Sequence, residues 1–242
     1  MKSEQENLST SGTNAVKERL NRRKFLSALG MGTAGAALIS SCGHNDWYDQ
    51  FRNNNKNGTT LDFKDDIGIL NYAYALEQLE AAFYTEVVAK SSSVFSASQN
   101  AFFNDIKLHE IAHREFFKKA LGSNAIGNLE VDFSSVNFGS KDSVLATAKA
   151  FEDLGVAAYN GAGYKIMTEA YLVIAGQIVS VEARHAAWIR DQISNGSFSD
   201  LNSLTALGAD NSKGLDAALP PSKVLPIAAT FIKTKIDVKN VF

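Results

Sequence analysis

The sequence predicts an all-α fold in which two similar helix pairs form one bundle. Apolar residues recur at helical spacing through most of residues 62–195. Within this stretch the pattern Glu-x-x-His occurs twice, at residues 110–113 and 182–185, and the apolar residues around both copies match. Side chains at that spacing lie on one face of a helix. Two matching copies indicate an internal repeat.

A second repeated pattern joins the remaining two helices. Residues 75–84 and 150–159 both read Ala-apolar-Glu-polar-Leu-x-x-Ala-x-Tyr. The match pairs two glutamates and two tyrosines: Glu77 with Glu152, and Tyr84 with Tyr159. Each half of the repeat therefore supplies one Glu and then one Glu-x-x-His.

On each helix, the residues that recur at steps of three and four form a row that should face the interior of the bundle. Two ionisable residues fall outside these inward-facing rows. On the first helix the row of residues 67–88 includes Glu77 but not Glu80, whose counterpart in the third helix is Gly155. We therefore expect Glu77, rather than Glu80, to act as a ligand in the site, and Glu80 to be solvated or to lie behind the ligands. His109 also falls off its row, and we expect it to play no part in the site.

The inward-facing rows carry six groups at positions that should otherwise be apolar: Glu77, Glu110, His113, Glu152, Glu182 and His185. Burying ionised carboxylates without partners is very costly. Two divalent cations would balance the four negative charges, with the imidazoles as neutral donors. Hard oxygen donors with one imidazole per ion favour iron, with manganese as the second choice. The alternative is a buried network in which carboxylates share protons and the histidines are ordinary core residues.

One Glu from each of two helices, with Glu-x-x-His from each of the other two, is the ligand set of the ferritin-like di-iron carboxylate bundles. Over residues 64–195 the chain resembles this family, and most closely its exported bacterial branch. The resemblance implies a four-helix bundle with a long crossover between helices 2 and 3. Residues 123–140 have a suitable length for that crossover.

The resemblance also implies a role for each of the six groups. Glu110 and Glu182 would bridge two metal ions, and the other two glutamates would each bind one ion, as would each histidine. Tyr84 and Tyr159 lie two turns from Glu77 and Glu152 on the same helix faces. They would hydrogen-bond the ligands, give up an electron, or serve as plain core aromatics.

The helix limits follow from local signals. We expect the second helix over about residues 98–121, the third from near Lys141, and the fourth from after Thr168 to near Asn195. Three glycines weaken the third helix, at positions 155, 161 and 163. They indicate either a close approach between helices or a break after Asn160.

The first 42 residues have the features of an export signal. Residues 21–27 resemble a twin-arginine motif, and the apolar run that follows is too short to cross a bilayer as a helix. Residues 38–42 resemble a lipobox, so we expect Cys42 to carry a lipid anchor; an incidental thiol is the alternative. We then expect a polar tether over residues 43–63 and, after the bundle, a C-terminal extension over residues 196–242 that packs on it.

The charge balance limits the function. Residues 1–41 hold six of the 24 basic and three of the 26 acidic residues, so the rest of the chain has a net charge of about −5. This balance gives no basic patch for nucleic acid. We expect an exported di-metal protein that oxidises iron(II) or reduces dioxygen or peroxide, attached to the membrane only through its lipid. Assembly into a homo-oligomer stays open, and the alternative function is a non-catalytic envelope protein stabilised by its metals.

Overall fold

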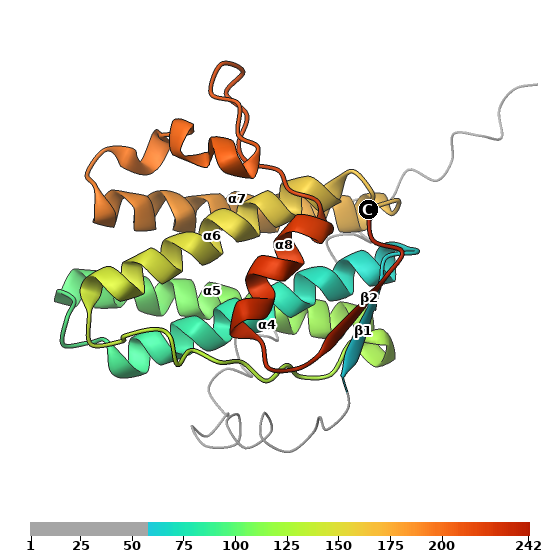
Figure 1. The fold of residues 1–242 in the computed structure, drawn as a ribbon, viewed down its shortest axis with the longest axis horizontal. Helices are drawn as coiled ribbons and strands as arrows, with labels where there is room; N and C mark the ends of the chain where they lie inside the picture. The colour runs from blue at the N-terminus through green and yellow to red at the C-terminus, as the bar shows by residue number, and fades with distance from the viewer. Residues whose placement is uncertain (1–57) are drawn as a thin grey trace, which may run out of the picture. The chain divides into compact units, whose positions relative to one another are not determined.

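The computed structural model describes residues 58–242, which form a mainly helical domain (Figure 1). The elements in chain order are β1 (Thr59–Asp62), α4 (Asp66–Lys90), α5 (Ala97–Leu121), η1 (Gly122–Asn124), α6 (Lys141–Gly163), α7 (Glu169–Ile193), η2 (Ser197–Ser199), η3 (Asn202–Leu207), α8 (Pro221–Ala228), η4 (Ala229–Phe231) and β2 (Ile236–Lys239). Within residues 58–242, no helix has both the length and the apolar character needed to span a membrane.

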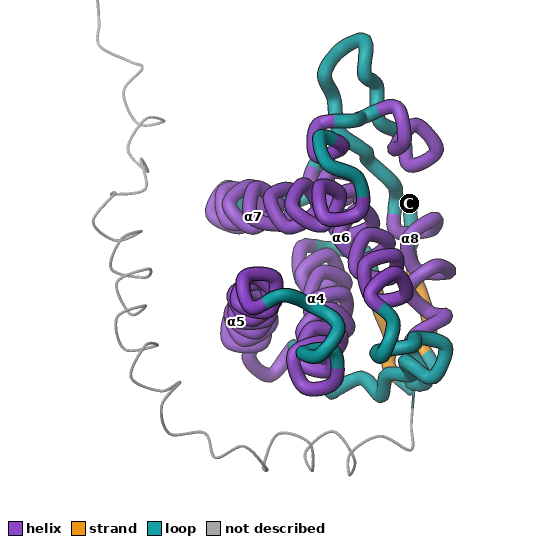
Figure 2. Tube along the Cα trace, turned by 90° about the vertical axis from the view of Figure 1, so that its left-hand side faces the viewer, coloured by secondary structure: helices purple, strands orange, loops and turns teal. Residues whose placement is uncertain are grey.

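Four long helices form the bundle. Helix α4 packs mainly on α5, and α6 mainly on α7, and the two pairs meet where α4 contacts α6. Figure 2 shows the four helices nearly end-on, with α5 and α7 on one side and α4 and α6 beside them. The long connection from Leu121 to Lys141 joins the two pairs. The predicted all-α four-helix bundle with a long crossover between its second and third helices is confirmed.

Helix α5 has the one-sided pattern that the sequence predicts. Its buried residues are Phe103, Ile106, Glu110, Arg114, Phe117 and Leu121, at steps of three and four. A capping box starts the helix, because the Ser96 hydroxyl accepts from the Gln99 N–H and the Gln99 side chain accepts from the Ser96 N–H. These local signals fix the helix start within one residue of the prediction and turn Glu110 toward the other helices.

Helix α4 is buried on every side, which the one-sided pattern of its sequence does not predict. Every residue from Gly68 to Tyr84 is buried. One side faces the bundle, and α8 and the two strands lie on the side of α4 and α6 away from α5 and α7 (Figure 2). The crossover covers α4 further, since the Gln78 side chain accepts from the Leu129 N–H at 2.8 Å and the Asn71 side chain accepts from the Ile126 N–H at 2.8 Å.

A small parallel sheet replaces the end of the predicted tether. Strand β1 pairs with β2, with Leu61 opposite Val238. Leu61 and Phe63 are both buried in the main core cluster. The tether was predicted to extend to residue 63, so its last residues were assigned wrongly. The remainder of the tether lies outside the described residues.

Helix α6 continues past Asn160 to Gly163, so of the two alternatives left open for its glycines the break is absent. Gly161 instead allows a close approach: a Cβ there would lie 1.8 Å from the Leu219 carbonyl oxygen, which belongs to the segment leading into α8. In α8, Val224 and Ala228 are buried in the same core cluster as Phe83 and Phe151. The segment after the bundle therefore completes the core around α4 and α6.

Candidate metal centre

The six predicted ligands meet inside the bundle. Helix α4 supplies Glu77, α5 supplies Glu110 and His113, α6 supplies Glu152, and α7 supplies Glu182 and His185. We call these six residues the carboxylate cluster. All four carboxylates are fully buried. The cluster divides into two overlapping groups, and within each group one ligand atom per residue lies within 4.8 Å of the others.

The first group surrounds His113. Its Nδ1 atom lies 2.8 Å from Glu182 Oε1, 3.4 Å from Glu77 Oε2 and 3.7 Å from Glu110 Oε2. One nitrogen and three carboxylate oxygens from three helices thus converge on one point.

The second group repeats this geometry around His185. Its Nδ1 atom lies 2.9 Å from Glu110 Oε1, 3.5 Å from Glu152 Oε2 and 3.7 Å from Glu182 Oε2. Glu110 and Glu182 therefore each turn one oxygen toward each histidine. The internal repeat of the sequence appears here as two matching sites that share two carboxylates.

The cluster's inward-facing atoms are poorly satisfied by the protein itself. Among the described residues, no hydrogen-bond partner is found for Oε2 of Glu77 and Glu152, for either oxygen of Glu110 and Glu182, or for Nδ1 of the two histidines. Buried polar atoms rarely stay unpaired. These atoms make up two sets of four, and each set consists of one histidine nitrogen and three carboxylate oxygens. In charge, in the type of atom offered to a metal and in number, the residues therefore fit a pair of metal ions.

Both tyrosines singled out in the sequence hydrogen-bond the cluster. The Tyr84 hydroxyl donates to Glu152 Oε1, and the Tyr159 hydroxyl donates to Glu77 Oε1. Each bond links α4 to α6 and leaves only Oε2 of its glutamate facing the histidine. Of the roles left open for Tyr84 and Tyr159, the structure shows the hydrogen bond. Burial, together with the charge of the glutamate that each contacts, raises the pKa of both phenols.

Without metal, protons must offset the cluster's negative charge. Burial lowers the pKa of His113, but the adjacent carboxylates of Glu110, Glu182 and Glu77 outweigh it and raise that pKa to about 12. Burial and the neighbouring Glu182 raise the pKa of Glu110 to about 8. The metal-free cluster therefore holds protons where cations would otherwise sit, and metal binding must release them.

His109 contacts the cluster, contrary to the expectation that it plays no part there. Its Nδ1 atom lies 2.9 Å from Nε2 of His185, and the two rings are parallel within 8°. The contact occupies the ring nitrogen of His185 that faces away from the carboxylates, and so orients its Nδ1 toward them. The repeat could not reveal this role, because the counterpart of His109 is Val181.

Glu80 is a further buried carboxylate, so of the two expected places, in solvent or behind the ligands, the structure excludes the first. Its side chain is only 3% exposed. It lies against the backbone of α6 at Gly155, where a Cβ would come 3.0 Å from Glu80 Oε1. The glycine thus leaves space for the carboxyl group. Burial and the charges of Glu182 and Glu110 raise the pKa of Glu80 well above its usual value.

The raised pKa predicts that Glu80 makes the stability of the metal-free protein depend on pH. The folded state holds the Glu80 proton more tightly than the unfolded state. This group therefore lowers the free energy of unfolding as the pH rises above the pKa that it has in the unfolded state. Glu80→Gln should therefore be more stable than the original protein at pH 8, with the gap closing toward pH 4 by up to about 1.4 kcal/mol per pH unit. Urea denaturation across this range measures the effect.

The exposed Glu169 on α7 provides the control for this comparison. Glu169→Gln should differ from the original protein by the same small amount at every pH. A constant difference between Glu80→Gln and the original protein would show that Glu80 is ionised in the folded state.

Comparison with known proteins agrees with this architecture. The family model described as "Ferritin-like domain" matches residues 65–195, which include all four bundle helices and the whole carboxylate cluster. A search of curated proteins returned no match. Because the family model covers more than half of the 242 residues, the chain belongs to the ferritin-like domain family.

Proposed function

We propose that the protein is an exported di-iron protein that oxidises iron(II) or reduces dioxygen or peroxide, in iron handling or in protection from oxidative stress. One observation carries the proposal: Glu110 and Glu182 each direct one oxygen to His113 and the other to His185. Ions that share two carboxylates are neighbours and can react together with one small oxidant.

A pair of iron(II) ions supplies two electrons at one place, which with two protons convert one hydrogen peroxide to two waters. The residues of the chain position this pair. The phenols of Tyr84 and Tyr159 fix one oxygen of Glu152 and Glu77. His109 restrains the ring of His185. Because the ligands lie on long helices rather than on loops, their spacing is set by the bundle.

The same geometry also supports the non-catalytic alternative. The cluster draws one or two residues from each of α4, α5, α6 and α7, so bound ions would cross-link all four helices. Ligands that bind only the folded state stabilise it by mass action. Turnover, rather than binding, separates the two functions.

The direct test loads metal-free protein with iron(II) under anaerobic conditions and then adds dioxygen or peroxide. A redox function predicts that ferric absorption develops and that each protein molecule oxidises many equivalents of iron(II) when more is supplied. A large rise in melting temperature, with no oxidation beyond the bound ions, would instead favour the structural function.

Two variants connect this activity to the cluster. Even partners behind a metal ligand contribute about 10–100-fold to metal affinity, so Glu182→Ala, which removes a shared ligand, should lower affinity by more than that and abolish oxidation. Helicity measured by circular dichroism should stay largely intact. Glu169→Ala, on the same helix but exposed, should behave as the original protein. Normal oxidation by Glu182→Ala would rule out the cluster as the reaction site.

Export and lipid attachment complete the proposal, and they rest on the sequence. The twin-arginine-like motif and Cys42 lie outside the described residues. In bacterial cells the protein should fractionate with membranes and carry lipid on Cys42, whereas Cys42→Ser should be released in soluble form. Equal fractionation of both forms would contradict the lipid anchor.

A further inference from the structure

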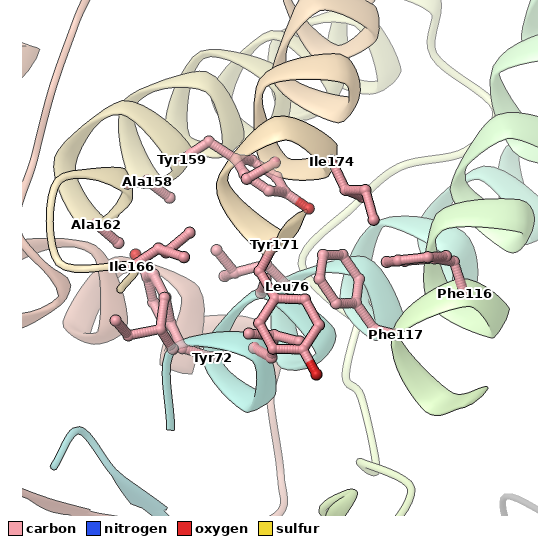
Figure 3. A pocket seen from close by; sticks show the side chains of 15 residues that line it. Tyr72, Leu76, Phe116, Phe117, Ala158, Tyr159, Ala162, Ile166, Tyr171 and Ile174 are labelled. Carbon is pink, nitrogen blue, oxygen red and sulfur yellow. The ribbon is translucent and has the colours of Figure 1, made fainter. Parts of the chain in front are cut away.

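An apolar cavity lies at one end of the bundle, where α4 and α7 begin and α5 and α6 end. All four helices line it, including Leu76 of α4, Phe116 and Phe117 of α5, Tyr159 of α6, and Tyr171 and Ile174 of α7. Figure 3 shows these side chains around the central space. Its walls are almost entirely carbon atoms and aromatic rings.

The cavity adjoins one half of the carboxylate cluster. Phe117 is four residues after His113, and Ala73, also in its wall, is four residues before Glu77. At 1.5 Å per residue each lies about 6 Å along its helix from the ligand. Tyr159 belongs to both places, because its ring lines the cavity while its hydroxyl donates to Glu77.

At the corresponding place in the other half of the repeat, aromatic rings pack against one another. Tyr84, the counterpart of Tyr159, packs against Phe83 and Phe103, with ring centroids 5.1 and 6.3 Å away. The cavity lined by Tyr159 lies on the His113 side of the cluster.

Size and polarity limit what the cavity can hold. It has a volume of about 30 Å³ for the centres of water-sized molecules. One water needs about 10–15 Å³ on this measure, so the space suits a molecule of only a few atoms. Peroxide or a hydrated ion would lose hydrogen bonds on entering such walls. Dioxygen has none to lose.

We propose that this cavity binds dioxygen and delivers it to the Glu77–His113 half of the cluster. The inference rests on the proposed function and extends it, because it makes dioxygen the oxidant that the fold admits from this end. Polar species have a different approach, since His109 is exposed and the His113 side chain is 12% exposed.

The wall contains a position that can be filled without touching a ligand. Ala175 of α7 is half-buried, lines the cavity, and lies seven residues before Glu182. Ala175→Leu adds three carbon atoms to the space. Ala170→Leu makes the same change at a half-buried position of the same helix that does not line the cavity, and serves as the matched control.

Xenon tests the cavity independently of any metal, because apolar cavities of this kind bind it. Metal-free crystals pressurised with xenon should show an atom between Phe117, Tyr159 and Ile174. The same peak should appear in Ala170→Leu and be lost in Ala175→Leu. No xenon at this position in the original protein would overturn the proposal.

Kinetics test delivery. In iron-loaded protein, Ala175→Leu should lower the second-order rate constant for oxidation by dioxygen at least about tenfold, while the rate constant with peroxide and the iron content stay unchanged. Equal rates with dioxygen in Ala175→Leu and Ala170→Leu would overturn the route. A protein that binds xenon but no iron would refute the metal centre while supporting the apolar cavity, so the two failures are distinct.

Discussion

The structure depends on one electrostatic constraint, the burial of Glu77, Glu110, Glu152 and Glu182 in one bundle interior. Four ionised carboxylates in such a place are unstable without compensation. Within the protein, two imidazoles and two phenol hydroxyls are available to compensate this charge. They still leave two sets of four atoms without a hydrogen-bond partner, each made of one histidine nitrogen and three carboxylate oxygens. The surrounding helices leave none of these four carboxylates exposed to solvent, which strengthens the need for cations.

The two halves of the cluster are similar in geometry but differ in their surroundings. On one side His109 supports His185, where the repeat has Val181. On the other side the cavity reaches Tyr159. Glu80 faces Gly155, the position that corresponds to it in α6, so the repeat has no matching carboxylate there. The duplicated frame therefore sets similar ligand distances in the two halves, whereas the residues behind the ligands make the two positions chemically unequal.

Helical spacing within each segment predicted the four helices, their order and the residues on their inward faces, and the resemblance to ferritin-like bundles implied that the six cluster residues converge. The sequence did not predict other features that arise from segments far apart in the chain. The burial of Glu80 depends on Gly155 of α6, and the β1–β2 pairing joins residues more than 170 positions apart. The contact of His109 with His185 likewise requires α5 and α7 to be side by side.

The central claim is that cations replace protons in the carboxylate cluster. Anaerobic calorimetric titration of metal-free protein with iron(II), performed at pH 7 in buffers with different heats of ionisation, counts both the ions bound and the protons released. Two ions per chain, with at least one proton released for each from His113 and His185, is the predicted result. Binding of one ion or none, or of two without proton release, would contradict the account.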